Sequence, residues 1–302
     1  MITPLQNFSR ISSAYNISFK VKRDDLYSFT GGGNKARKMK SVLYDAKEKG
    51  ADALVSAGAP NSNHARVVAI AGAEVGWPVH LIIHGTEDYS NGNLKLMRLA
   101  GARLSFVEKH DVSEAMDNAM NNLTKEGHTP YYIMGGGHTI HGMLAYYEAV
   151  NEFLNQSAGW VPDYVIHASG TGGTQAGLHV GFAVHFPKTQ VIGISVARDK
   201  ARGKKIIEES VLELCNHLDI SNRDSSKKIN FFDNWTGGGY EKIFPRLTDS
   251  IKKAARLGGL ITDPTYTGKA ITAFFDMCEN GKINKESRVL FWHTGGMINL
   301  LK

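Results

Sequence analysis

The strongest constraint on the fold of this chain is that short apolar runs alternate with segments of helical periodicity along most of its length. Residues 51–59, ADALVSAGA, predict a buried strand, and residues 63–77, NHARVVAIAGAEVGW, predict a helix with small residues packed on a sheet. The same order recurs, with further strands predicted at residues 78–85, 103–108, 130–137, 163–174 and 190–197 and a last strand in RVLFWHTGG, residues 288–296. Strands that alternate with helices are joined by right-handed crossovers into parallel sheets. The predicted fold class is therefore α/β.

Glycine and hydroxyl residues follow several of the predicted strands, at Gly58, Gly135–Gly137, Ser169–Thr174 and Thr294–Gly296. Parallel sheets bind ligands at the carboxyl ends of their strands, where such residues let a backbone approach a ligand closely. The sequence therefore predicts a small-molecule site at these strand ends.

Composition narrows the classes of partner. With 302 residues the chain is long enough for two lobes, and its net charge of +6 is spread along the sequence without a basic arm. We therefore expect no nucleic-acid partner. The N-terminus lacks the pattern of a signal peptide, and the sequence has no run of about 18 apolar residues that could span a membrane. Two cysteines are too few for a disulfide framework. These features predict a cytoplasmic enzyme without a membrane partner.

The segment ASGTGGTQAG, residues 168–177, is the strongest single indication of a ligand. It leaves a strand and opens a helix, whose free N–H groups and positive dipole end attract a phosphate. It is not a Walker loop, because Gly-Thr-Gln stands where Gly-Lys-Ser/Thr is required. It also lacks the acidic residue of a dinucleotide site at the end of the next strand. A mononucleotide or a phosphorylated cofactor is favoured over an empty glycine turn.

Ser62, Asn63 and His64 stand where a strand ends and a helix begins. Simple helix capping explains them about as well as an anion site that takes a substrate carboxylate. Metal ligation is disfavoured, because the histidines show no zinc-binding spacing and no cysteine pair accompanies them. We therefore expect no metal site.

Lys35 follows three glycines and an asparagine in FTGGGNKARKMK, residues 29–40. A lysine becomes a nucleophile when burial or a nearby cation lowers its pKa, and Arg37 and Lys38 lie close in sequence. Taken alone, the stretch fits a solvated basic helix start better than a reactive lysine.

Taken together, these loops resemble the fold type II pyridoxal-phosphate enzymes, and within them the family of D-cysteine desulfhydrases and 1-aminocyclopropane-1-carboxylate (ACC) deaminases. The resemblance spans nearly the whole chain in seven motifs: KRDDL, GGNKARK, SNHAR, GNLKLMRLAGA, SGTGGTQAG, DPTYTGKA and LFWHTGG. It implies two domains of the tryptophan synthase β-like type, each a mostly parallel twisted sheet flanked by helices. The large, cofactor-binding domain would comprise residues 1–43 and 149–302, and the small domain residues 44–148. It also implies a homodimer.

The resemblance assigns roles to the residues of these motifs. Lys35 would hold pyridoxal 5'-phosphate as a Schiff base, and Asn63 would bond the phenolic oxygen of its ring. Ser62 and His64, together with Asn63, would face the substrate carboxylate, with Ser62 also counted as catalytic. The catalytic tyrosines would be Tyr240 and Tyr266. The remaining cofactor contacts would come from seven residues: Gly170, Thr171, Gly172, Gly173, Thr174, Thr267 and Thr294.

Two positions separate the branches of this family. ACC deaminases carry Glu and Leu where this chain has Thr267 and Thr294, and desulfhydrase-like members carry threonines. The resemblance therefore implies β-elimination from a small amino acid, giving pyruvate, ammonia and the leaving group, which is sulfide for D-cysteine. A β-replacement synthase, an ACC deaminase, an amino-acid racemase and a non-catalytic amino-acid-binding protein remain as alternatives.

The chain also departs from the family pattern. Asn61 stands where the family usually has glutamine, YEKIFP replaces the usual YGLP around the first tyrosine, and only six residues follow HTGG. These departures lie in substrate-facing surroundings, so the substrate need not be D-cysteine. Candidates include cysteate, β-chloroalanine, serine derivatives and diaminopropionate.

Overall fold

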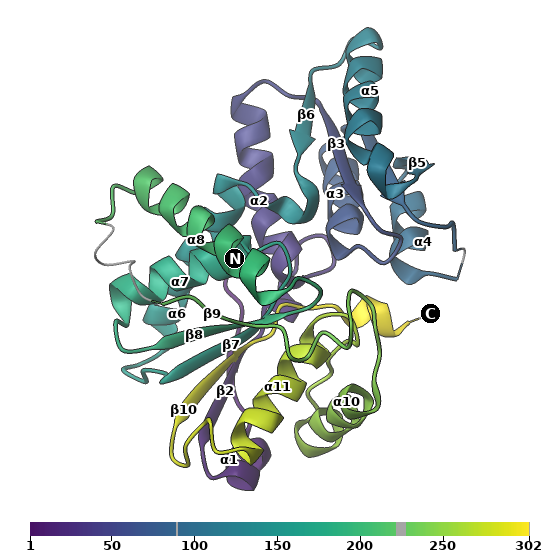
Figure 1. Ribbon diagram of the computed structural model, residues 1–302. Coiled ribbons are helices and arrows are strands. Elements are labelled where there is room, and N and C mark those ends of the chain that lie inside the picture. The colour runs from purple at the N-terminus through teal and green to yellow at the C-terminus, as the bar shows by residue number, and fades with distance from the viewer. Residues whose placement is uncertain (89, 222–227, 302) are drawn as a thin grey trace. The chain divides into compact units, whose positions relative to one another are not determined.

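The computed structural model describes residues 1–88, 90–221 and 228–301 (Figure 1). The chain divides into two compact units. Unit 1 comprises Met1–Tyr27, Gly32–Asn34 and Met143–Leu300, and unit 2 comprises Ser28–Gly31 and Lys35–Gly142, with Leu301 also grouped to it. Two of the crossings between the units lie inside helices, α2 (Gly33–Glu48) and α6 (Ile140–Gln156), and Ser28–Gly31 makes a short excursion into unit 2 before α2.

Unit 1 is built on a six-stranded sheet in the order β1-β2-β10-β7-β8-β9. All neighbours pair in parallel except β1 and β2. The strands are β1 (Leu5–Asn7), β2 (Ser18–Lys22), β7 (Tyr164–Ser169), β8 (Gln190–Ser195), β9 (Asn230–Phe232) and β10 (Arg288–Trp292). The prediction of a parallel sheet is confirmed here, and the antiparallel edge strand β1 is an addition that the alternation of elements did not predict.

Helices cover both faces of this sheet because its strands bury alternate residues on opposite sides. On one face, Phe19, Ile166 and Phe291 pack with Ile11 of α1 and Phe274 of α11. The opposite face has its own core, which joins side chains of α6 and α7 to these strand residues: Val165, Val191, Leu290 and Trp292. Figure 1 shows the arrangement, with α8 beside α7. The helices are α1 (Ser9–Tyr15), α6, α7 (Gly173–His185), α8 (Lys200–His217), α10 (Pro245–Gly258) and α11 (Thr267–Glu279).

Unit 2 holds a four-stranded, wholly parallel sheet in the order β5-β4-β3-β6. Its strands are β3 (Ala53–Gly58), β4 (Val79–His84), β5 (Arg103–Val107) and β6 (Pro130–Ile133). Its helices are α2, α3 (Asn63–Val75), α4 (Gly92–Leu99) and α5 (Val112–Lys125). Met116 and Leu123 of α5 pack with Val55 on one face. On the other face α3 approaches so closely that a Cβ at Gly72 would lie 2.1 Å from Val79 Cγ2.

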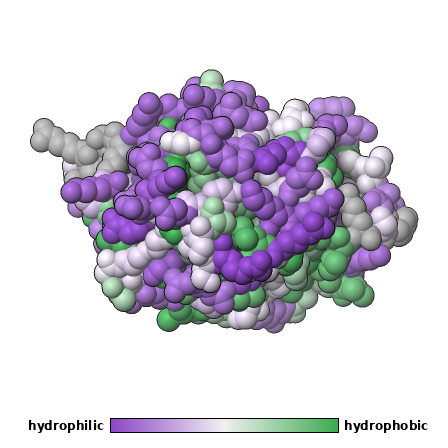
Figure 2. Space-filling view, turned by 90° about the horizontal axis from the view of Figure 1, so that it is seen from below, coloured by the Kyte–Doolittle hydropathy of each residue, from purple (hydrophilic) through white to green (hydrophobic). Residues whose placement is uncertain are grey.

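The surface carries both hydrophilic and hydrophobic residues. The face in Figure 2 is largely hydrophilic, with hydrophobic residues scattered among the polar ones. Leu99 and Ile2 are among the large hydrophobic side chains that water reaches, at 82% and 72% exposure. Isolated exposed hydrophobic residues of this kind are normal for a protein surface. Within the described part of the chain, no helix is both long and apolar enough to cross a membrane.

Candidate active site

The glycine-rich loop after β7 lies in unit 1 and leads directly into α7, as the sequence predicted. Gly172 precedes the helix with φ of +100°, a backbone conformation that side chains with a Cβ rarely adopt. No side chain caps α7, so the first backbone N–H groups of this helix face the loop and receive no hydrogen bond from a capping side chain. Thr174 accepts a hydrogen bond from Asn34 Nδ2 at 3.1 Å, which ties the loop to the start of α2.

One buried polar atom beside this loop indicates what it could hold. Ser169 is 1% exposed, and its Oγ has no hydrogen-bond partner among the described residues. A buried hydroxyl without a partner is costly, and a ligand oxygen would satisfy it. Together with the uncapped helix of 13 residues behind it, this hydroxyl makes the loop a fitting site for a phosphate group.

Two tyrosines of unit 1 meet at their hydroxyl groups. The Oη atoms of Tyr240 and Tyr266 lie 2.5 Å apart, and the rings pack edge to face with centroids 6.0 Å apart. Burial raises the pKa of both phenols, and the pKa of Tyr266 is raised further by Tyr240. Both therefore stay protonated at neutral pH, and the pair can hand a proton to a group that departs beside it.

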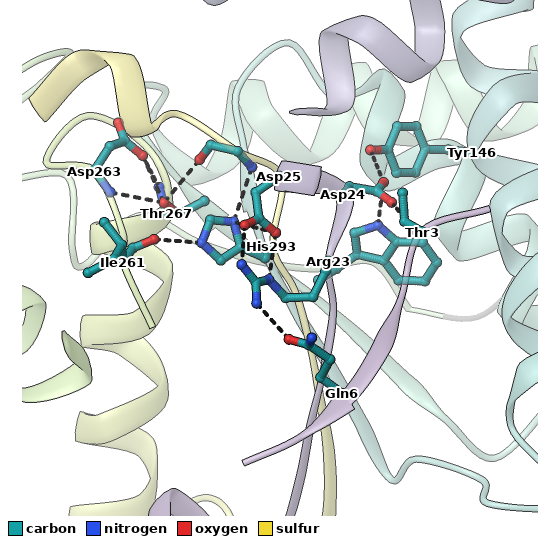
Figure 3. A network of polar contacts seen from close by, with 12 residues as sticks. Thr3, Gln6, Arg23, Asp24, Asp25, Tyr146, Ile261, Asp263, Thr267 and His293 are labelled. Atoms are coloured by element: carbon teal, nitrogen blue, oxygen red, sulfur yellow. Dashed lines mark hydrogen bonds and ion pairs between the residues drawn. The ribbon is translucent and has the colours of Figure 1, made fainter. Parts of the chain in front are cut away.

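Tyr266 and Thr267 are held by a buried carboxylate, that of Asp263. Its two oxygens accept hydrogen bonds from the backbone N–H groups of residues 265, 266 and 267 at 2.8–3.0 Å, and from the hydroxyl of Thr267 at 2.8 Å. Asn299 donates a fifth bond at 3.3 Å. Burial raises the pKa of Asp263, and these donors oppose that shift. The carboxylate thus shapes the turn that presents Tyr266, and Figure 3 shows part of this arrangement.

The end of β10 brings Thr294 to the same unit. Its carbonyl oxygen accepts from the N–H of Asn34 at 3.0 Å, directly before Lys35 in sequence. The neighbouring His293 is buried and lies between Ile261 and Asp25 (Figure 3). Its Nδ1 accepts from the N–H of Gly295 at 3.2 Å, so Nε2 carries the proton and donates to the Ile261 carbonyl at 2.7 Å. These two hydrogen bonds fix the orientation of His293 at the end of the strand.

Lys35 lies in unit 2, in the first turn of α2, and is partly exposed. The preceding glycines, residues 31–33, all have φ near +80°, which explains why this bend uses glycine. The Nζ of Lys35 donates to the carbonyl oxygen of Gly136 at 2.9 Å. One turn further along α2, Lys38 is almost fully buried. Burial and the charge of Lys35 lower the pKa of Lys38 well below its usual value.

Ser62 and His64 sit at the start of α3 in unit 2 and do different work. Ser62 caps the helix by accepting from the N–H of Ala65 at 3.1 Å, so the capping role is confirmed for this residue. His64 points instead into the unit, where its Nε2 lies 2.9 Å from Ser56 Oγ. Ser56 donates to the carbonyl of Ile133, so it accepts from His64. Burial and the charges of Lys35 and Lys38 lower the pKa of His64, which is therefore neutral.

Asn63 is oriented by two residues for which the sequence pattern suggested no role. Its Oδ1 accepts from Arg66 at 3.3 Å and from Asn93 Nδ2 at 3.2 Å. Asn93 also donates to the carbonyl of Asn61, at 3.0 Å. With its oxygen engaged, Asn63 presents its amide N–H groups as donors, which suits a phenolic oxygen. Asn93 belongs to the motif GNLKLMRLAGA, and its place in this family motif was the sequence signal that could have indicated a role for it.

The predicted site residues thus form two groups, each inside its own unit. Unit 2 contains Lys35, Ser62, Asn63 and His64. Unit 1 contains the loop Gly170–Thr174, the two tyrosines, Thr267 and Thr294. The hydroxyl of Thr267 is already engaged by Asp263 and by the Gly295 carbonyl at 3.2 Å, which makes it a structural residue as well.

Comparison with known proteins decides the family. The model of the family described as "Pyridoxal-phosphate dependent enzyme" matches residues 2–295. The chain belongs to this family. It is 34% identical to a D-cysteine desulfhydrase of Yersinia enterocolitica, over 97% of this chain and 91% of that protein. It is 35% identical to a Pyrococcus abyssi protein with the provisional name 1-aminocyclopropane-1-carboxylate deaminase, over 98% of this chain and 89% of that protein.

Solved structures agree with this assignment. A crystal structure of an ACC deaminase homologue superposes with a TM-score of 0.92 at 31% identity, covering 100% of this chain and 91% of that one. The predicted family, the fold type and the pyridoxal-phosphate cofactor are confirmed. The chain is an enzyme, and the loop with its uncapped helix and unpartnered Ser169 hydroxyl fits the phosphate of that cofactor.

Proposed function

We propose that this enzyme catalyses β-elimination on a small amino acid with a leaving group at Cβ, in the manner of a D-cysteine desulfhydrase. One molecule of amino acid and one of water give pyruvate, ammonia and the protonated leaving group. With cysteine as substrate the leaving group is hydrogen sulfide, and the atoms balance without an oxidant or a reductant. Bound pyridoxal phosphate supplies an aldehyde that condenses with amines and withdraws electrons from Cα.

The observation that carries the proposal is the pair of neutral phenols, Tyr240 and Tyr266, at hydrogen-bond distance. Elimination places negative charge on the departing sulfur or oxygen, and a positioned acid lowers that barrier. Because burial raises both pKa values, the proton remains available over the physiological range. The second phenol can then re-supply the first through their shared hydrogen bond.

We assign the remaining steps to residues of unit 2. Lys35 would hold the aldehyde of bound pyridoxal phosphate through its amine, and we assign the removal of the Cα proton to the same amine when it is free. The first turn of α3 receives the substrate carboxylate through the hydroxyl of Ser62 and the amide of Asn63. His64 is neutral and engaged with Ser56, so we expect it to shape this turn rather than to pair with the carboxylate.

Elimination is favoured over ring-opening deamination by what surrounds position 267. A threonine stands there, and its hydroxyl is engaged by Asp263. The carboxylate of Asp263 is in turn surrounded by donors from its own turn and from Asn299. Neither group offers a free carboxylate for a pyridine nitrogen, so the electron withdrawal that a glutamate would strengthen is weaker here.

A substrate panel tests the proposal. The holoenzyme is incubated with both enantiomers of cysteine, cysteate, β-chloroalanine, serine, O-acetylserine and diaminopropionate, and pyruvate and ammonia are measured. The two products should form in equal amounts, except from diaminopropionate, whose leaving group is a second ammonia. We expect both products from at least one of them. Tyr240→Phe and Tyr266→Phe should each lose about 10²-fold in kcat, while Tyr44→Phe, on a side chain 67% exposed, should not.

The panel can also contradict the proposal. Absence of pyruvate from every amino acid would exclude elimination. New amino acids formed when thiols are added would identify a replacement enzyme, inversion of an enantiomer a racemase, and 2-oxobutyrate from ACC a deaminase.

We further propose that the enzyme is a cytoplasmic homodimer, with a small domain at residues 44–148 and a large domain formed by the rest. The likeness of the chain to pyridoxal-phosphate-dependent enzymes over residues 2–295 supports this proposal. Light scattering of the purified holoenzyme should give twice the mass of 33.1 kDa. A monomeric mass at micromolar concentration would contradict the dimer.

A further inference from the structure

Lys269, in the first turn of α11, has a charged side chain in the interior of unit 1. It is 0% exposed, and its Nζ donates to three carbonyl oxygens: Val196 at 2.9 Å, Thr236 at 2.8 Å and Gly239 at 2.8 Å. An ammonium group has three donors, and here each has found one acceptor. All three acceptors are neutral backbone groups, so Lys269 is held as a cation in a cage of carbonyls.

The cage joins the segments that present the two tyrosines. Lys269 follows Tyr266 by three residues on α11, while Thr236 and Gly239 belong to the segment that ends in Tyr240. Val196 comes directly after β8 and adds a fixed point on the sheet. Residues 237–239 are all glycines with positive φ, so this segment has few side chains of its own to anchor it.

Burying a charge costs free energy unless strong contacts compensate it, and the lowered pKa of Lys269 reflects this cost. Burial lowers the pKa of Lys269 to about 8, although the charges of Asp263 and Glu241 oppose the shift. An apolar side chain could fill the same volume without this cost. A buried lysine with only carbonyl partners therefore indicates that a positive charge is needed at this point.

Carbonyl cages of this kind are also how proteins bind alkali-metal ions, because several carbonyl dipoles together replace the hydration shell. We propose that Lys269 is a positioning residue that acts as a tethered monovalent cation, drawing the Thr236–Gly239 segment onto α11 so that Tyr240 meets Tyr266. The enzyme would then need no alkali-metal ion. Removal of the lysine side chain would leave a cage that a free monovalent cation can enter.

The experiment compares wild type with Lys269→Met, whose side chain is one heavy atom shorter, so that it removes the charge and the donors and vacates the position of Nζ. Activity is measured on the best substrate of the panel in tetramethylammonium chloride, which is too large for the cage. The same assay is repeated in sodium, potassium, ammonium and caesium chloride. We expect Lys269→Met to lose about 10²-fold in kcat in tetramethylammonium, because the tyrosine pair is displaced. Its KM should change far less.

Potassium or ammonium should restore at least a tenth of the wild-type kcat, with a saturable dependence on concentration. The wild type should respond equally to all five salts. Lys252→Met removes an exposed lysine of α10 and should behave as wild type in every salt. Undiminished kcat of Lys269→Met in tetramethylammonium would overturn the proposal, and so would a folded variant that no cation rescues.

The measurements of kcat rest on the proposed elimination. The melting temperature is therefore measured as well, because it does not depend on activity. An ion that binds only the folded protein raises its melting temperature as concentration increases. Potassium should therefore raise the melting temperature of Lys269→Met relative to tetramethylammonium, and leave that of the wild type unchanged. This holds even if the substrate panel fails. If Lys269→Met does not fold, Lys269→Gln, which keeps two donors, is measured in the same way, and a cation-independent melting temperature in that variant would also overturn the proposal.

Discussion

Lys35 and Lys269 lie in different units and show how a protein can use the same side chain in opposite ways. Lys35 is partly exposed and donates to the carbonyl oxygen of Gly136, on a glycine turn. Lys269 is fully buried and donates to three carbonyls from two separate segments. The first lysine begins a helix and stands at its edge, whereas the second is enclosed by the protein.

This difference indicates that hydrogen-bond acceptors and burial, rather than residue type, decide whether a lysine takes part in a reaction or holds other segments in place. A lysine whose three donors are all satisfied inside the protein must break three bonds before it can move. A partly exposed lysine in the first turn of a helix can turn toward an aldehyde and return. We therefore assign the chemistry to Lys35 and the positioning to Lys269, and the following changes test that division.

The largest effect is expected at Lys35. Lys35→Ala removes both the amine that takes up the cofactor and the proposed base, so kcat should fall by at least about 10³-fold. Pyruvate release measures the loss, and the visible absorbance of the reconstituted protein shows whether the cofactor is still attached to a lysine. Lys40→Ala, on an exposed side chain of the same helix, is the matched control. An unchanged visible band in Lys35→Ala would show that the assignment is wrong.

Most strands of the fold could be predicted from the sequence, and there is a physical reason why others were missed. The predicted strands from β3 to β8, and β10, are all present, because their apolar runs are continuous and bounded by turns. β2 was not predicted. Its Lys22 is buried against Glu152 and Gln156, more than 100 residues away, and such a pairing leaves no local pattern.

The cage around Lys269 was missed for a related reason. Its partners are backbone carbonyls, which every residue possesses, so the sequence cannot distinguish them. The sequence did contain one usable signal, a single charge in the apolar stretch TGKAITAFF at residues 267–275. A lone lysine among small and apolar residues of a helix predicts burial, and a buried lysine needs acceptors.

A smaller effect is expected from the turn that receives Lys35. In Gly142→Ala the new Cβ would lie 2.3 Å from the carbonyl oxygen of Gly137, next to the acceptor of Lys35. The turn must shift, and we expect a loss of about 1–3 kcal/mol in unfolding free energy, measured by urea titration. Gly135→Ala adds a Cβ to the same turn with no atom within 4 Å, and should change stability by less than about 0.5 kcal/mol. Equal losses in the two variants would show that the turn does not depend on close packing.

The pH dependence of stability separates Lys269 from its surroundings. The pKa of Lys269 is about 8 in the folded protein, below the ordinary lysine value of 10.5. Between these two values the unfolded chain binds more protons, so this residue makes the unfolding free energy rise with pH, by up to about 1.4 kcal/mol per unit. Below pH 8 the burial of the charge reduces stability, and this cost disappears as pH rises.

Lys269→Met should lack this contribution, so the stability of wild type minus that of the variant should increase from pH 7 to 9.5. The charged groups that act on the ammonium are the carboxylates of Asp263 and Glu241. Burial raises the pKa values of the nearby phenols, Tyr240 and Tyr266, above this window. Urea titrations at five pH values suffice. A difference that stays constant with pH would contradict a lowered pKa for Lys269.

The smallest effect is expected at Asn63, which is positioned by side chains rather than by backbone carbonyls. Asn93→Ala removes one of two donors to Asn63 Oδ1 and the bond to the Asn61 carbonyl, while Arg66 still holds Asn63. Because one positioning contact remains, we expect cofactor affinity to fall by only about 1 kcal/mol, close to fivefold. Titration of the apoenzyme with pyridoxal phosphate, followed by visible absorbance, measures this, with Asn122→Ala on the exposed face of α5 as control. A hundredfold loss would mean that Asn93, like Lys269, is a support that no neighbour can replace.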